Sequence, residues 1–306
     1  MSSRRNLALL VGLALIWGSS FMFIKVAVRE LSPATLILGR IGLAAVTLAI
    51  LVPWNRETVD ELRENAGWLV VIALINTAAP FWLLSWGETR IDSGLASILQ
   101  GAVPIFNAVI AFGFFHEVRV TGLRLVGIAI GFLGVALLVG AQPSGKVLGA
   151  LAVVGMALCY GIGGLLVGRH LKRVRPLVIA FASTLIATIV ALPAGIVQAP
   201  HTVPGWKVIA SVVVLGVPGL AVAYLLFFAL ITRAGAAYAS LVTYLIPPIA
   251  LGYGAIFLGE HFGATAFGGL ALILAGVALG TGAVKAVGLR GRQAYIGAGA
   301  AGDSNS

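Results

Sequence analysis

The sequence predicts an all-α membrane protein with ten transmembrane helices, arranged as two inverted five-helix repeats. Three observations lead to this prediction. The composition is far more hydrophobic than that of a soluble protein, the chain divides into ten apolar segments, and its two halves match each other in order. The spacing of polar and aromatic residues along these segments then indicates where a central binding site would lie.

The composition excludes most classes of soluble protein. Of the 306 residues, 60% are hydrophobic and 10% are charged, and the mean hydropathy is +1.06. A soluble domain has about 25% charged residues, so this chain lacks the polar surface to coat a water-facing globule. The single cysteine, Cys159, excludes an intramolecular disulfide and a cysteine-based metal site. The net charge of +10 does not indicate nucleic-acid binding, because the basic residues lie between long apolar runs.

Ten apolar segments are each long enough to cross the hydrocarbon core as a helix, which takes about 20 residues. Their hydrophobic runs are continuous rather than alternating, so helices are favoured over the strands of a barrel. The first segment resembles a secretory signal, but its apolar run continues to Val28, which favours a membrane helix. The expected helices cover residues 7–28, 33–53, 67–87, 92–115, 119–140, 147–168, 176–197, 206–231, 235–258 and 264–285.

The distribution of basic residues predicts the orientation. If the first helix starts in the cytoplasm, most of the 20 Lys and Arg residues fall in the connections on the cytoplasmic side. The positive-inside rule therefore places both termini in the cytoplasm. Residues 288–306 are rich in Gly, Ala and Ser, and we expect them to form a disordered cytoplasmic tail.

An internal repeat relates residues 1–143 to residues 144–287. Because each half holds five expected helices, an odd number, equivalent helices must run in opposite directions across the membrane. Inverted repeats of this kind recur in transporters, which bind their substrate near the midplane between the halves. The matches that indicate the repeat are Trp17-Gly18 with Tyr160-Gly161, Pro33 with Pro176, Thr89-Arg90 with Thr232-Arg233, Ala96-Ser97 with Ala239-Ser240, Pro104 with Pro247, and Glu117 with Glu260.

With these features the sequence resembles the EamA-type drug/metabolite transporter superfamily. The resemblance rests on the five-plus-five repeat, on Trp17-Gly18-Ser19, and on a proline thirteen residues before a glutamate, which occurs in both halves. The first half departs from the family pattern where Phe115-His116-Glu117 lacks the glycine found in Leu258-Gly259-Glu260. Within the superfamily the chain is most similar to bacterial exporters of amino acids, including aromatic ones. The resemblance implies a cytoplasmic-membrane efflux protein with ten helices around a central cavity.

Polar residues on the fourth and ninth segments are candidates for the wall of that cavity. In the fourth segment they recur every three or four residues, so they share one helix face. Polar groups in hydrocarbon must face protein or water, which leaves two readings: a cavity wall, or hydrogen bonds between helices. The candidates are Ser97, Gln100, Pro104 and Asn107 in the fourth segment and Ser240, Thr243, Tyr244 and Pro247 in the ninth.

Aromatic and polar residues of four other segments complete the predicted substrate-binding set. Aromatic rings at mid-span could stack on a planar substrate, although they could also face lipid or form an interfacial belt. The candidates are Trp17 and Phe21 in the first segment, Asn76, Pro80 and Trp82 in the third, Tyr160 in the sixth and Tyr224 in the eighth. Pro104 and Pro247 could kink their helices.

Charged residues inside the segments are few. Arg40 lies within the second segment, where it could serve function or only bind a backbone carbonyl. The acids lie near segment ends, among them Glu88, Glu117 and Glu260. Because carriers driven by ions usually need an acid or histidine at depth, the sequence favours uncoupled, facilitated export over proton-coupled export.

Several alternatives remain open at this point. The substrate could be another small metabolite or a drug, with or without proton coupling, and a passive channel would also fit the spans. An intramembrane enzyme is disfavoured, because no nucleophile–base pair and no metal-binding motif falls within a segment. We expect no cofactor and no resident metal, a small-molecule substrate, contact with membrane lipid and a monomer built of two self-contained halves.

Overall fold

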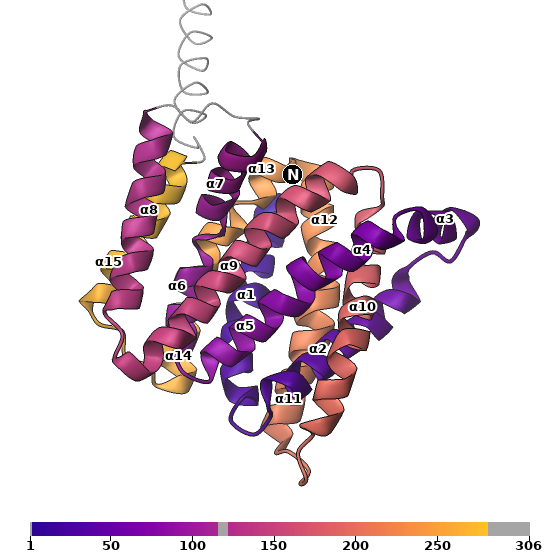
Figure 1. Ribbon diagram of the computed structural model, residues 1–306, viewed down its shortest axis with the longest axis horizontal. Coiled ribbons are helices and arrows are strands. Elements are labelled where there is room, and N and C mark those ends of the chain that lie inside the picture. The colour runs from indigo at the N-terminus through magenta and orange to yellow at the C-terminus, as the bar shows by residue number, and fades with distance from the viewer. Residues whose placement is uncertain (1, 116–121, 281–306) are drawn as a thin grey trace, which may run out of the picture.

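The computed structural model describes residues 2–115 and 122–280 of the chain (Figure 1). The expected tail at 288–306, Glu117 and the last residues of the tenth expected helix lie outside these ranges. Throughout the described residues the regular structure is helical and contains no strand. Figure 1 shows that α1 begins at the same end of the bundle as the one where α15 finishes.

In the described part of the chain, eight helices are long and apolar enough to cross a membrane, and two further apolar helices are shorter. The uninterrupted ones follow the expected ranges within a few residues, except that α1 begins earlier, at Ser2, and α8 later, at Leu123. Their bounds are α1 (Ser2–Ala27), α2 (Pro33–Leu51), α8 (Leu123–Gly140), α9 (Ser144–His170), α10 (Pro176–Val197) and the shorter α15 (Ala264–Gly280).

The third and eighth segments each contain a π-helical turn in the middle. A π-turn inserts one residue into the α-helical register and is often found at functional sites. These turns lie beside Pro80 in the third segment and around Pro218 in the eighth, so the two halves are interrupted at matching places. The third segment consists of α4 (Ala66–Ala73), η1 (Leu74–Ala78) and α5 (Ala79–Glu88), and the eighth of α11 (Trp206–Gly216), η2 (Val217–Val222) and α12 (Ala223–Ala234).

The fourth and ninth segments are each split into two helices. The fourth consists of α6 (Ser93–Gln100) and α7 (Val103–Phe115), and the ninth of α13 (Ala236–Ala239) and α14 (Val242–Leu258). Pro104 lies in the first turn of α7, where a proline costs no helical hydrogen bond. Pro247 instead lies inside α14, after the break at Ser240 and Leu241. Of these two prolines, Pro104 lies directly at a helix break and Pro247 does not.

A short polar helix, α3 (Arg56–Glu64), connects the second and third segments and was not among the expected helices. It starts where the side chain of Asn55 accepts a hydrogen bond from the backbone of Thr58, a typical N-cap. Arg175, just before α10, forms an ion pair with Glu61 at 3.1 Å and a second with Glu57 at 3.4 Å. These contacts tie the two halves together at the end where α1 begins.

The contacts between the halves are reciprocal. α2 packs along α10 and α8 along α15, so each of these pairs joins equivalent helices of the two repeats. α1 of the first half packs against α11, α12 and α14 of the second, while its counterpart α9 packs against α5, α6 and α7 of the first. The first helix of each half therefore lies against the interrupted segments of the other.

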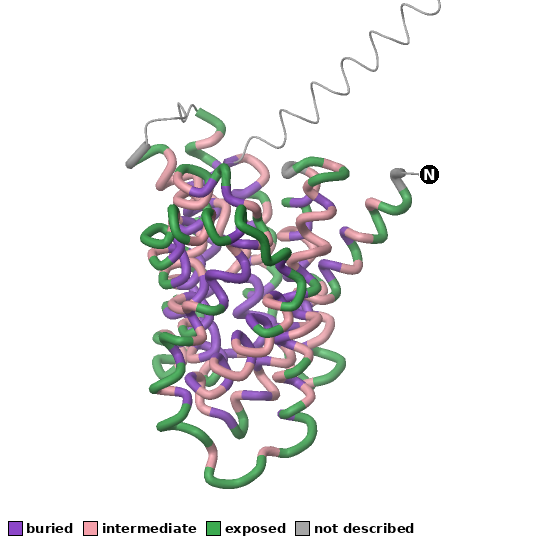
Figure 2. Tube along the Cα trace, turned by 90° about the vertical axis from the view of Figure 1, so that its right-hand side faces the viewer, coloured by how far each residue is buried: buried purple, intermediate pink, exposed green. Residues whose placement is uncertain are grey.

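Glycines allow the closest helix approach, between α8 and α15. A Cβ atom added at Gly276 would lie 2.5 Å from the Cα atom of Gly131, so Gly276 tolerates no side chain without a shift of the backbone. Such small residues are typical of helix contacts in lipid. Buried residues concentrate in the middle of the bundle (Figure 2), whereas large apolar side chains such as Val46, Ile189 and Ile256 are exposed on its outside. That apolar outer surface suits lipid.

Candidate functional site

A cavity of about 380 Å³ lies where the interrupted segments of both halves meet α1, α2 and α9. Its wall combines both π-turns, through Asn76 of η1 and Gly219 and Leu220 of η2, with the break that follows α6 at Gly101. Each interruption removes regular helix backbone from the cavity edge and makes room between segments that would otherwise pack tightly. The cavity therefore depends on the irregular elements of both halves.

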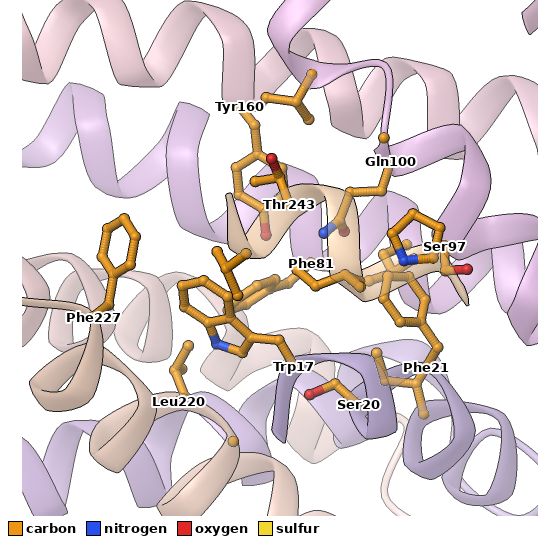
Figure 3. Close-up of a pocket in the computed structure, with 18 of the residues that line it drawn as sticks. Trp17, Ser20, Phe21, Phe81, Ser97, Gln100, Tyr160, Leu220, Phe227 and Thr243 are labelled. Carbon is orange, nitrogen blue, oxygen red and sulfur yellow. The ribbon is translucent and has the colours of Figure 1, made fainter. Parts of the chain in front are cut away.

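Aromatic rings are prominent in the cavity wall (Figure 3). They come from four segments, and two of them pair with each other: the rings of Trp17 and Phe227 have centroids 5.4 Å apart. Such rings bury large apolar area and favour offset or edge contacts with a further ring. The aromatic lining residues are Trp17, Phe21, Phe81, Tyr160, Tyr224 and Phe227.

Polar groups enter the cavity from the split segments. The side chain of Gln100 points into it beside Thr243 (Figure 3). The hydroxyl groups of Ser97 and Thr243 donate hydrogen bonds to the backbone carbonyls of Gly94 and Ser240, at 2.6 and 2.7 Å. These hydroxyl oxygens keep lone pairs to accept a bond, whereas the amide of Gln100 can both donate and accept.

Most of the residues expected to bind substrate lie on this wall. The structure brings together Trp17, Phe21, Asn76, Ser97, Gln100, Pro104, Tyr160, Tyr224, Ser240, Thr243 and Pro247. Their role in substrate binding stays a prediction. Residues of both halves thus lie around one space.

Four of the expected residues do not line the cavity, and their positions correct the prediction. Trp82 is 38% exposed on the outside of the bundle, and Pro80 is buried within it. The π-turn of η1 explains both, because its extra residue rotates the following turns. Phe81 and Leu84 then face the cavity. A regular 3.6-residue period from Asn76 does not reach Phe81, so sequence reasoning missed it.

The other two corrections concern the split segments. Asn107 lies in α7, where its backbone packs closely on Gly161 of α9, and its buried side-chain oxygen has no hydrogen-bond partner. Tyr244 lies one position from Thr243 and packs on the hydrophobic core instead of entering the cavity. Pro104, Thr243 and Pro247 lie past the helix breaks of the same segments and do line the cavity, so only part of each predicted face reaches it.

Arg40 also lines the cavity, although its sequence position left two readings open. It is 5% exposed, and its guanidinium carbon lies 4.3 Å from the centroid of the Phe81 ring. Neither Nε nor Nη1 has a hydrogen-bond partner, which excludes a backbone carbonyl as the partner of these two nitrogens. Arg40 is the only charged side chain in the cavity wall, as far as the described residues show.

A second cavity, of about 520 Å³, continues from the first toward the end of the bundle where α1 begins. The two share Trp17, Asn76, Tyr224 and Phe227. The second reaches Lys172 in the connection between α9 and α10. The central cavity is therefore accessible from this end of the bundle, which we call the N-terminal end.

At the opposite end, polar contacts hold the segments together. Lys25 of α1 donates hydrogen bonds to the backbone carbonyls of Glu88 and Ile91, at 2.8 and 2.6 Å. The carboxylate of Glu260 accepts bonds from the backbone nitrogens of Ser93 and Gly94, at 2.8 and 3.1 Å. Both sets of contacts cross between segments, and the second joins the two halves. They close the end that we call the far end.

Glu88 lies near a segment end, as the sequence predicts. It is the last residue of α5, yet it is 0% exposed and neither carboxylate oxygen has a hydrogen-bond partner. Lys25, Arg40 and Glu260 are the charged groups within electrostatic range. A buried acid is thus present beside the closed end.

Comparison with protein families identifies the fold. The model of the EamA-like transporter family matches twice, at residues 5–140 and 147–281. The chain belongs to the EamA-like transporter family. The two matches correspond to the two halves related by the internal repeat, and with the apolar helices they make the chain a multi-pass transporter of the bacterial inner membrane.

Individual relatives of this EamA-like transporter agree with that assignment. A probable terminal-alkyne amino-acid exporter of Streptantibioticus cattleyicolor is 30% identical over 272 residues, covering 86% of this chain and 89% of the relative. The uncharacterized transporter YvbV of Bacillus subtilis is 26% identical and covers 90% of this chain and 91% of its own. A solved crystal structure superposes with a TM-score of 0.60 at 16% identity, covering 91% of this chain and 97% of that one. That likeness supports the fold alone.

Proposed function

We propose that the transporter has ten membrane-spanning helices in two inverted repeats, residues 1–143 and 144–287, with both termini in the cytoplasm. Three features support this arrangement. The fourth and ninth segments are split, the third and eighth contain matching π-turns, and the packing of α1 and α9 is reciprocal. The basic connections on the N-terminal side support the orientation. The protein then works as a monomer, because the cavity is enclosed by one chain.

The same transporter exports amino acids, including aromatic ones, from the cytoplasm. The observation that carries this proposal is the central cavity, whose wall holds aromatic rings from four segments together with the amide of Gln100. Aromatic walls stack on planar side chains, and a few convergent polar groups orient a small ligand. The name of the Streptantibioticus relative, a probable amino-acid exporter, supports the same substrate class.

Transport proceeds by alternating access. With the N-terminal end in the cytoplasm, the cavity shown here is open to the cytoplasm and closed at the far end by the contacts of Lys25 and Glu260. Rocking of the two halves would break these contacts and close the path beside Lys172, with the helix breaks absorbing the movement. Binding occurs in the aromatic cavity, close to the middle of the segments.

Export is facilitated and uncoupled in this proposal, so the substrate moves down its own gradient. The second candidate is proton-coupled export, and one observation favours it: Glu88 is fully buried and unpartnered close to the closed end. Buried acids of this kind serve proton relays in many carriers. The two candidates differ in whether a pH gradient drives accumulation.

Uptake into proteoliposomes tests the proposal. Labelled phenylalanine, tryptophan, threonine and alanine are offered separately, without an ion gradient, and empty liposomes serve as the control. Saturable uptake that unlabelled phenylalanine inhibits is expected, with aromatic substrates preferred. No uptake of any amino acid, with or without a proton gradient, would overturn the substrate class. Uptake that rises linearly with concentration, without saturation, would indicate a channel instead.

A further inference from the structure

The position of Arg40 on the cavity wall is unusual for a charged residue in a membrane protein. It lies in the second span, is 5% exposed, and its Nε and Nη1 atoms have no hydrogen-bond partner. A charge at this depth is costly and is normally paired or placed for function. The ring of Phe81, 4.3 Å from the guanidinium carbon, attracts the charge but accepts no conventional hydrogen bond.

No acidic side chain of the described residues pairs with Arg40. Glu88 acts on it only from a distance, since both of its carboxylate oxygens also lack hydrogen-bond partners. Tyr160 and Tyr224 lie within electrostatic range and line the same cavity. The guanidinium therefore belongs to the wall of a space large enough for a small molecule, and the protein leaves two of its nitrogens unpaired. A guanidinium fork matches a carboxylate with two parallel hydrogen bonds.

We propose that Arg40 binds the α-carboxylate of the substrate, so that the cavity selects compounds with an anionic group next to an apolar or aromatic body. This inference rests on the proposed function and adds the group that anchors the substrate. With the carboxylate at Arg40, the side chain of an aromatic amino acid reaches the rings of Trp17 and Phe227. The ammonium group meets the carbonyl oxygen of Gln100 and the faces of the rings.

The charges of the wall argue against a cationic substrate. Arg40 is its single described charge, and a cation would meet this positive group without a carboxylate to neutralise it. An amine formed from an amino acid by loss of its carboxylate should therefore bind weakly. The amide of the same amino acid should also bind weakly, because an uncharged group replaces the carboxylate that would meet Arg40.

Competition with wild-type protein tests the inference without any substitution. Uptake of labelled phenylalanine into proteoliposomes is measured against unlabelled phenylalanine, phenylalaninamide, phenylethylamine and 3-phenylpropionate. We expect the amide and the amine to compete roughly ten- to a hundredfold more weakly than phenylalanine, as a lost charge-assisted hydrogen bond implies. 3-Phenylpropionate keeps the carboxylate and should compete better than the amine. Equal competition by phenylethylamine and phenylalanine would overturn the role of Arg40 while leaving amino-acid transport in place.

Substitution of Arg40 supplies the second arm. Arg40→Gln should weaken phenylalanine binding about as much as removal of the carboxylate does, and should weaken phenylethylamine binding little or not at all. Arg40→Lys should retain part of the preference for the carboxylate, since it keeps the charge but loses the fork. Arg233→Gln, at the exposed end of α12, makes the same change of charge away from the cavity and should leave both affinities unchanged.

Weaker binding by Arg40→Gln could arise from misfolding or from loss of the carboxylate contact, and the two causes need to be kept apart. Binding is measured by tryptophan fluorescence on purified protein whose melting temperature is recorded in parallel, so that a misfolded Arg40→Gln is recognised. If the variant is misfolded, the competition series on wild-type protein alone decides whether the carboxylate is recognised. A folded Arg40→Gln that binds phenylalanine as wild type does would overturn the inference. If wild-type protein neither binds nor transports any amino acid, the proposed function fails and this inference fails with it.

Discussion

Glu260, just after α14, caps the N-terminal end of α6 through Ser93. Its Oε1 accepts a hydrogen bond from the backbone nitrogen of Ser93 at 2.8 Å, and its Oε2 accepts one from the hydroxyl of Ser93 at 2.9 Å. A carboxylate at a helix N-terminus is stabilised by the free N–H groups and the helix dipole. Because Glu260 and Ser93 belong to different halves, this cap also closes the far end of the cavity.

Loss of the Glu260 carboxylate should therefore favour opening at the far end. In Glu260→Gln the amide keeps one acceptor oxygen but loses the charge, and three hydrogen bonds of the cap are weakened. We expect Ser20→Cys, a cavity position in a background with Cys159→Ala, to react several-fold faster with a membrane-impermeant maleimide added at the far side. Ser93→Ala removes one of the three bonds and should give a smaller increase. Unchanged labelling in both variants would contradict a gate at this contact.

Trp17 should contribute more to the binding affinity of aromatic substrates than to that of aliphatic ones. Trp17→Ala removes a cavity ring that already contacts Phe227, and one aromatic pair contributes about 0.5–1.5 kcal/mol, or roughly two- to tenfold in affinity. The inhibition constants of phenylalanine and alanine in proteoliposomes measure the difference. Trp82→Ala, on the exposed side of α5, is the matched control and should change neither constant. An equal loss for phenylalanine and alanine would indicate a general defect instead of ring stacking.

Trp17 lines the cavity whereas Trp82 lies on the outside of the bundle. The difference shows what sequence periodicity can and cannot predict. Composition and continuous apolar runs place α10 at 176–197, as predicted, because Pro176 fixes its first turn and the run ends at Val197. The face of a helix is predictable only while its period is constant. The π-turn at Leu74–Ala78 changes that period, so Phe81 reaches the cavity where a regular helix would have presented other residues.

Arg40 and α3 illustrate two further limits. The depth of Arg40 in the second segment is evident from the sequence. That it lines the cavity depends on the packing of α2 against η2, and no local signal carries that information. For α3, a signal was present: Asn55 precedes Thr58 with N-cap spacing, in a stretch too polar to be a membrane helix. A prediction that rests on apolar segments does not include it.

The contact between α8 and α15 should be sensitive to single methyl groups. Gly276→Ala places a Cβ atom 2.5 Å from the backbone of Gly131, and overpacking of this kind costs about 1–3 kcal/mol. We expect a lower melting temperature in detergent, followed by intrinsic tryptophan fluorescence. Gly268→Ala lies in the same helix, but its nearest neighbour would be 3.9 Å away, so it should melt as wild type does. Equal melting of the two variants would contradict the glycine-dependent packing.

Glu88 decides between the two modes of export. Lys25 of α1, Arg40 of α2 and Glu260 beyond α14 lie within electrostatic range of Glu88, and its carboxylate has no hydrogen bond to lose. Under facilitated export, Glu88→Gln should retain saturable phenylalanine uptake, and a pH gradient of either direction should change wild-type uptake little. Uptake in proteoliposomes of equal protein content, with inside and outside pH set separately, measures both.

Accumulation driven by the gradient in wild type and abolished in Glu88→Gln would instead establish proton coupling through this acid. Glu64→Gln, on the polar connecting helix α3, removes one carboxylate outside the membrane segments and should leave the response to the gradient unchanged.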